Sequence, residues 1–108
     1  MFDKIIVGEV PADNVYEDGQ CFACRDISPQ APVHVLLVPR QRITGLRAVT
    51  AEHEELLGHQ LIVAHQMAQQ QGDGGFRCVI NAGADGGQKV PHLHIHVLIG
   101  RSMTAPPD

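Results

Sequence analysis

The sequence predicts an α+β fold, in which one long helix packs on a mainly antiparallel sheet of about five strands. Three observations support this prediction. Short β-runs follow one another through turn residues, one segment has the period of an amphipathic helix, and the chain of 108 residues has the size of one compact domain. We therefore expect a single domain over residues 1–108.

The first half of the chain predicts a hairpin followed by a third strand. Residues 3–10 precede Pro11 and have the pattern of a short helix or a strand. Asp18-Gly19 is a favourable hairpin turn between NVYE and QCFACRDI. The SPQAP segment at 28–32 then interrupts the chain, and the next β-run, from Val33 to Val38, ends at Pro39.

The second half begins with the helix. Thr50 is a suitable N-cap, and three glutamates follow in the first turns, where the helix dipole favours negative charge. Apolar residues recur every three or four positions, so we expect a helix from about 51 to 71, ended by GDGG at 72–75. Residues 76–81 predict a strand, GADGGQK a loop, and residues 92–99 the last strand.

Composition excludes several classes of protein. The net charge is −4 with no basic run, so we expect no extended nucleic-acid surface. No apolar segment has the length of a membrane helix, and the N-terminus lacks the apolar region of a secretory signal. Three cysteines are too few to suggest a disulfide framework. We therefore expect a cytoplasmic protein with neither a membrane nor a nucleic-acid partner.

The most informative stretch is PHLHIHVLIG at 91–100, in which His92, His94 and His96 occupy alternating positions. In a strand, residues i, i+2 and i+4 point the same way, so the three imidazoles would face one cavity while the apolar residues between them face the core. A shift of one residue would bury three polar rings, which fixes this register strongly. A solvated face with three exposed histidines is the alternative.

Two kinds of chemistry fit such a face. The histidines could bind a metal, with His34 as a fourth ligand, since imidazole suits zinc, copper and iron. Alternatively, one imidazole could be a nucleophile while others orient it and exchange protons. A phosphorus centre suits the second case, because backbone N–H groups of the glycine-rich loop and the amides of Asn81 and Gln88 could hold anionic oxygens. The residues alone leave both open.

The stretch His92-Leu93-His94-Ile95-His96-Val97-Leu98 matches the pattern His-φ-His-φ-His-φ-φ, where φ is apolar. The sequence thus resembles the histidine triad (HIT) superfamily. KIIVGEVPA, DISPQAPVHVLLVPR, LLGHQLIVA, NAGADGGQ and the final GRSM…PP are similar to its nucleotide-binding (Hint) branch. The resemblance implies a five-stranded antiparallel sheet with a short N-terminal helix, and a homodimer with a continuous ten-stranded sheet.

The resemblance also implies an activity. Members of the branch hydrolyse purine nucleoside phosphoramidates and aminoacyl adenylates, releasing AMP and an amine without a metal or other cofactor. We therefore expect a purine nucleotide ligand similar to AMP or GMP. The alternative is a nucleotide-binding regulatory module with weak or no catalysis.

Roles follow for individual residues by the same resemblance. His94 would attack the phosphorus, His96 would contact the phosphate or leaving group, and His92 would orient His94. His34 would support the proton network, and Asp26 would hold the ribose. The remaining nucleotide contacts implied are Phe2, Ile5, Ile27 and Leu36 around the base, and Asn81, Gly87, Gln88 and Lys89 near the phosphate or leaving group.

Several positions depart from the branch. Lys89 stands in place of a serine near the leaving group, and Ala105 in place of a tryptophan. Cys24 replaces an aromatic residue expected around the base, and the Cys-x-x-Cys pair that binds structural zinc in some relatives is missing before KII. Cys21 and Cys24 have this spacing, yet on a strand they would face opposite sides, which is poor geometry for zinc. Cys78 is expected in the core.

Overall fold

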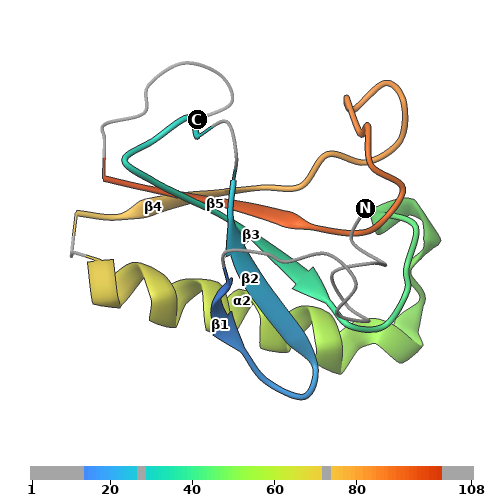
Figure 1. Cartoon of the computed structure of the whole chain (residues 1–108). Coiled ribbons are helices and arrows are strands. Elements are labelled where there is room, and N and C mark those ends of the chain that lie inside the picture. Colours follow the sequence, from blue (N-terminus) through green and yellow to red (C-terminus); the bar gives the residue numbers. More distant parts are fainter. Residues whose placement is uncertain (1–13, 27–28, 72–73, 101–108) are drawn as a thin grey trace.

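The computed structural model describes residues 14–26, 29–71 and 74–100 and contains one five-stranded sheet (Figure 1). The strands are β1 (Asn14–Glu17), β2 (Cys21–Arg25), β3 (Val33–Pro39), β4 (Phe76–Val79) and β5 (Ile95–Ile99). Their order is β1-β2-β3-β5-β4, and every neighbouring pair is antiparallel. The predicted fold class is confirmed, whereas the short N-terminal helix expected at 3–10 lies outside the described residues.

The β1–β2 hairpin turns at Asp18-Gly19, as predicted. The Asp18 carboxylate accepts hydrogen bonds from the backbone N–H groups of Gln20 and Cys21, at 2.7 and 2.9 Å. Asp18 thus stabilises the turn by hydrogen bonds from its side chain to the backbone of the next residues, as aspartate commonly does. The hairpin sets the register in which Glu17 pairs with Phe22 and Tyr16 with Ala23.

Helix α2 (Glu54–Gln71) is preceded by two short 3₁₀ helices, η1 (Leu46–Ala48) and η2 (Ala51–His53). Thr50 caps η2: its side chain accepts from the Glu52 N–H at 3.3 Å, and His53 Nδ1 accepts from the Thr50 N–H at 3.0 Å. The predicted helix is therefore confirmed with its N-cap, and its first turn is 3₁₀. Among the described residues, no helix is long and apolar enough to cross a membrane.

The core lies between α2 and one face of the sheet (Figure 1). Val63, Ala64, Met67 and Ala68 of the helix pack on residues of β2, β3 and β5 that share this face: Cys21, Ala23, Val35, Leu37, Ile95, Val97 and Ile99. The opposite face carries a smaller cluster of Phe22, Cys24 and Val38. Cys21 and Cys24 thus face opposite sides, as expected for their spacing, whereas Cys78 is exposed and the prediction that it is buried was wrong.

The last strand is shorter than predicted, because β5 begins at Ile95 and not at His92. Its final pair with β3 is Leu37 with Ile95, and Pro39, which ends β3, has no N–H to extend the ladder. The segment before β5 bonds elsewhere: the Leu93 N–H donates to the Ile43 carbonyl at 2.7 Å. His92 and His94 consequently lie in an irregular segment, and only His96 belongs to the strand.

Candidate active site

The histidines gather on the face of the sheet opposite α2. Alternation along β3 and β5 directs Val35 and Val97 into the helix-side core, which leaves His34 and His96 on the other face. In this register Leu36 pairs with His96 and His34 pairs with Leu98, so the two histidines are diagonal neighbours. His34, His92 and His94 are buried, and His96 is partly exposed.

His34 and His96 form a hydrogen-bonded pair beside Asp26, the residue that follows β2. His34 Nε2 lies 2.9 Å from His96 Nδ1 and 3.3 Å from Asp26 Oδ2, which is itself 3.9 Å from His96 Nδ1. Burial, followed by the neighbouring His94 and His34, lowers the pKa of His96, and the Asp26 carboxylate opposes that shift. His96 is therefore neutral at physiological pH.

The backbone assigns the protons of this pair. The Gln30 N–H donates to His34 Nδ1 at 2.9 Å, so His34 Nδ1 carries no proton and neutral His34 is protonated at Nε2. His34 Nε2–H then donates to His96 Nδ1, which must be an acceptor. The proton of neutral His96 consequently sits on Nε2, so this ring presents a donor to the site.

His94 has the opposite tautomer. Its Nδ1 lies 2.8 Å from the backbone carbonyl oxygen of His92, which can only accept, so Nδ1 is protonated and Nε2 holds a lone pair. The rings of His94 and His96 meet edge to face, with centroids 5.1 Å apart. Neighbouring imidazoles thus offer one nucleophilic nitrogen and one N–H donor.

His92 acts on His94 through its backbone carbonyl, and its ring lies elsewhere. His92 Nε2 donates to the carbonyl oxygen of Pro39 at 3.1 Å, in a buried position. This bond joins the irregular segment before β5 to the end of β3, where the sheet ladder has stopped. The His92 ring therefore fixes the position of the segment that contains His94.

The glycine-rich loop before the triad is closed by Gln88. Its Oε1 accepts from the Gly83 N–H at 3.0 Å, while its Nε2 donates to the carbonyls of Thr44 and Val90 at 2.7 and 3.0 Å. All three bonds go to backbone groups, so the side-chain amide that the sequence suggested for a ligand shapes the loop. Asn81 at the start of the loop is half-buried, and Gly87 is exposed with a φ of 81°.

The other predicted contacts are only partly described. Leu36 is half-buried against the cluster of Phe22, Cys24 and Val38 on the histidine side of the sheet. Cys24 is buried there as well, at the position where the family resemblance expects an aromatic residue. Predicted residues that lie outside the described part of the chain are Phe2, Ile5, Ile27 and Ala105.

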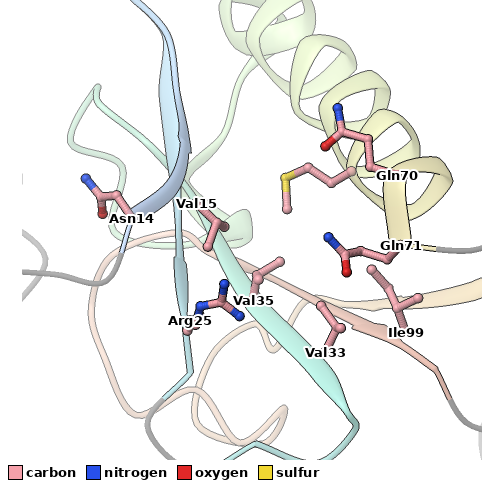
Figure 2. A pocket seen from close by; sticks show the side chains of 9 residues that line it. Asn14, Val15, Arg25, Val33, Val35, Gln70, Gln71 and Ile99 are labelled. Carbon is pink, nitrogen blue, oxygen red and sulfur yellow. The ribbon is translucent and has the colours of Figure 1, made fainter.

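Hollows on the described surface include the following two. One, of about 500 Å³, lies between residues 44–48 and residues 83–91, directly before the triad in the chain. The other, of about 350 Å³, lies between the sheet and the C-terminal end of α2, where Gln70, Gln71 and Arg25 surround an apolar floor (Figure 2). No histidine lines either hollow, but Val90 and Pro91 of the first hollow directly precede His92, so the first hollow is the one that adjoins the triad segment.

Two groups among the described residues could hold a metal ion, each with ligand atoms within 4.8 Å of one another. One is Asp26, His34 and His96; the other is Asp18, Cys21 and His59. Neither group includes His92 or His94, so the three triad imidazoles do not converge on one metal position. Sequence reasoning missed the Gln30 contact and the second group, because both depend on distances across the fold.

Comparison with known proteins identifies the family. The HIT domain model matches residues 7–103. An uncharacterized HIT-like protein of Synechococcus elongatus is 56% identical over 108 residues, covering 99% of this chain and 95% of that protein. A 14 kDa zinc-binding protein of Zea mays is 48% identical over 110 residues, covering 99% and 86%.

Solved structures agree. The crystal structure of a HIT family hydrolase from Legionella pneumophila has a TM-score of 0.96 and 45% identity, covering 100% of this chain and 98% of that one. The resemblance seen in the triad motif thus extends over the whole fold. The chain therefore belongs to the HIT domain family.

Proposed function

We propose that the protein hydrolyses purine nucleoside phosphoramidates, including aminoacyl adenylates, through a nucleotidyl-His94 intermediate and releases AMP and an amine. One observation carries the proposal: His94 presents a lone pair on Nε2 beside an Nε2–H donor on His96. Similarity to a HIT family hydrolase over the full chain supports hydrolysis in general. The phosphoramidate substrate follows from resemblance to the Hint branch.

In the first step, His94 Nε2 attacks the α-phosphorus and the bond between phosphorus and the amine nitrogen breaks. The electron pair of that bond stays on the amine, which takes the Nε2 proton of His96. The nucleotidyl-His94 ring becomes cationic and His96 anionic, with their centres about 5 Å apart. The Nε2–H of His34 stabilises the charge on His96 by donating to its Nδ1.

In the second step, water attacks the phosphorus, its oxygen replaces His94 Nε2, and its proton returns to His96. AMP leaves and both rings regain their starting tautomers. Asp26 would receive the ribose hydroxyls with the carboxylate that also contacts His34, so nucleotide binding and the proton network share a residue. Leu36 and the residues at positions 2, 5 and 27 would line the base, and Asn81, Gly87 and Lys89 would lie near the phosphate.

The test is AMP release from an adenosine phosphoramidate by the parent, by His94→Ala and by His65→Ala. Loss of the nucleophile should reduce turnover by roughly 10⁴-fold or more, because the covalent route is removed. His65 is an exposed helix residue whose ring contacts Phe76, so its substitution should leave turnover unchanged. Parental turnover by His94→Ala would remove the proposed intermediate.

The alternative is a nucleotide-binding module with little catalysis, favoured by the three backbone bonds that occupy the Gln88 amide and by Lys89 in place of serine. Calorimetry with AMP, combined with the turnover assay, separates the two functions. Binding without measurable AMP release would favour the module.

A metal at this site would compete with the proposed reaction. Two histidines and a carboxylate suit zinc, and the maize relative is described as zinc-binding. The ion would need lone pairs on His34 Nε2 and His96 Nδ1, the two atoms that now form a 2.9 Å hydrogen bond, so His34 would have to lose its Nε2 proton. Stoichiometric zinc in protein purified without a histidine tag would overturn a metal-free mechanism.

We also propose a homodimer that extends the sheet through β4. This strand is an edge of the sheet, and its first residue, Phe76, is 40% exposed. The Phe76 ring contacts the ring of His65 on α2. Leu61, which is 53% exposed, lies one helical turn before His65, so the exposed apolar surface continues from β4 to α2. Light scattering should give a dimer for the parent and a larger monomer fraction for Phe76→Lys; a monomeric parent would exclude this assembly.

A further inference from the structure

The hollow beside the triad is basic in an acidic protein. It has a volume of about 500 Å³, and its charged lining residues are Arg47 and Lys89; none of the described residues that line it carries a carboxylate. Asp85 lies on the same loop but outside the lining. Since the chain carries a net charge of −4, this local excess of positive charge indicates an anionic ligand.

The side chains of Arg47 and Lys89 could both contact a ligand. Among the described residues, neither Arg47 nor Lys89 forms an ion pair or a hydrogen bond with another side chain, and both are exposed. The Arg47 stem lies directly on Gly83: a Cβ there would be 2.9 Å from Arg47 Cδ and 3.0 Å from Nη1. Gly83 also has a φ of 72°, so the contact uses a conformation and a space that favour glycine.

Of the two other polar side chains of the hollow, Thr44 is uncharged and Gln88 is already hydrogen-bonded. Gln88 forms its three hydrogen bonds with backbone groups of both walls. The charged groups that remain to recognise a ligand are therefore the guanidinium and the ammonium.

The hollow adjoins the segment that carries the reacting histidine. The Leu93 N–H donates to the carbonyl of Ile43, the residue before the lining residue Thr44, at 2.7 Å. The His92 N–H donates to the carbonyl of Val90, itself a lining residue, at 2.8 Å. No histidine lines the hollow, and a group attached to phosphorus at His94 would have to extend past Pro91 to enter it.

We propose that this hollow is a leaving-group subsite that selects amines carrying a second, anionic group, a carboxylate or a phosphate. The proposal rests on the phosphoramidate hydrolase function. Arg47 and Lys89 are its specificity-determining residues, and they would attract an anionic leaving group and repel a cationic one.

The experiment compares adenosine phosphoramidates of propylamine, β-alanine, O-phosphoethanolamine and 1,3-diaminopropane, which place a neutral, carboxylate, phosphate or ammonium group at similar length. For the parent, kcat/KM should rise with negative charge. Each exposed cation should contribute up to about fivefold to the anionic-to-neutral ratio. The anionic-to-neutral ratio should fall in Lys89→Ser, in Arg47→Gln and on addition of salt. The control is Arg42→Gln, which changes an exposed arginine outside the hollow and should leave the ratio unchanged.

Equal kcat/KM for the neutral and anionic amines, or a preference that survives both substitutions, would overturn the subsite. A preference for β-alanine or for O-phosphoethanolamine identifies which anion it takes. The same ratios, measured as equilibrium affinities on His94→Ala, test the subsite without turnover. Absence of AMP release from every substrate would therefore refute the hydrolase, while an affinity ratio near one would refute the subsite.

Discussion

The Gln30 backbone N–H lies 2.9 Å from Nδ1 of His34, and this contact sets the tautomer of two rings. His34 must carry its proton on Nε2, where His96 accepts it, and His96 then presents its own proton to the site. A backbone group that never meets the substrate thus determines which nitrogen of His96 is a donor.

The contact between Gln30 and His34 predicts what happens when the backbone N–H of residue 30 is removed. Gln30→Pro deletes the N–H, whereas Gln30→Ala keeps it. ¹⁵N NMR of the parent and of Gln30→Ala should show Nε2–H tautomers for His34 and His96 and an Nδ1–H tautomer for His94. Gln30→Pro should add an Nδ1–H population at His34 and lower kcat. Identical histidine spectra in the two variants, with both folded by circular dichroism, would contradict the assignment.

His96 also predicts how stability depends on pH. Burial and the neighbouring histidines lower the pKa of His96 from its ordinary value of 6.5. The unfolded state therefore binds a proton first as the pH falls, so the stability contributed by neutral His96 is full above pH 6.5 and is lost as the pH falls through the folded-state pKa. Urea unfolding of the parent should show a lower free energy of unfolding at about pH 5 than at about pH 7.5. His96→Asn should reduce that difference; an equal difference in parent and variant would assign it to other groups.

Asp18 and His59 predict a contribution to stability far from the site. His59 Nε2 on α2 donates to Asp18 Oδ2 at 2.6 Å, and the Tyr16 hydroxyl donates to the same oxygen at 2.6 Å. Burial alone would raise the pKa of Asp18, but bonds from Tyr16, the turn backbone and His59 hold it well below its usual range. His59→Ala should lower the free energy of unfolding by about 1 kcal/mol, a typical value for one hydrogen bond. His65→Ala is the control, and an equal loss in both variants would refute the tie between hairpin and helix.

The sequence predicted the sheet, the helix with its Thr50 cap and the hairpin, because alternation, helical period and turn residues are local signals. It placed the start of β5 three residues early, since the competing bond between Leu93 and Ile43 joins segments that are distant in the chain. The motif located the histidines but not their protons, which depend on Gln30 and on the Pro39 carbonyl. For the same reason the contact of His59 with Asp18, across 41 positions, had no sequence signal.

Gly58 and Gly83 have opposite surroundings, so substitution by alanine should have opposite effects on stability. Gly58 lies inside α2, with nothing within 4 Å of an added Cβ, so Gly58→Ala should raise the free energy of unfolding by about 0.5–1 kcal/mol through helix propensity and a less flexible unfolded chain. Gly83 has a φ of 72° and no room beside Arg47, so Gly83→Ala should lower it by roughly 1–2 kcal/mol. Thermal and urea unfolding measure both effects. Gly83→Ala should in addition displace Arg47 and reduce the preference for anionic leaving groups, whereas Gly58→Ala should leave that preference unchanged. A stabilising Gly83→Ala would show that the loop relaxes freely, and that Gly83 does not hold Arg47 in the hollow.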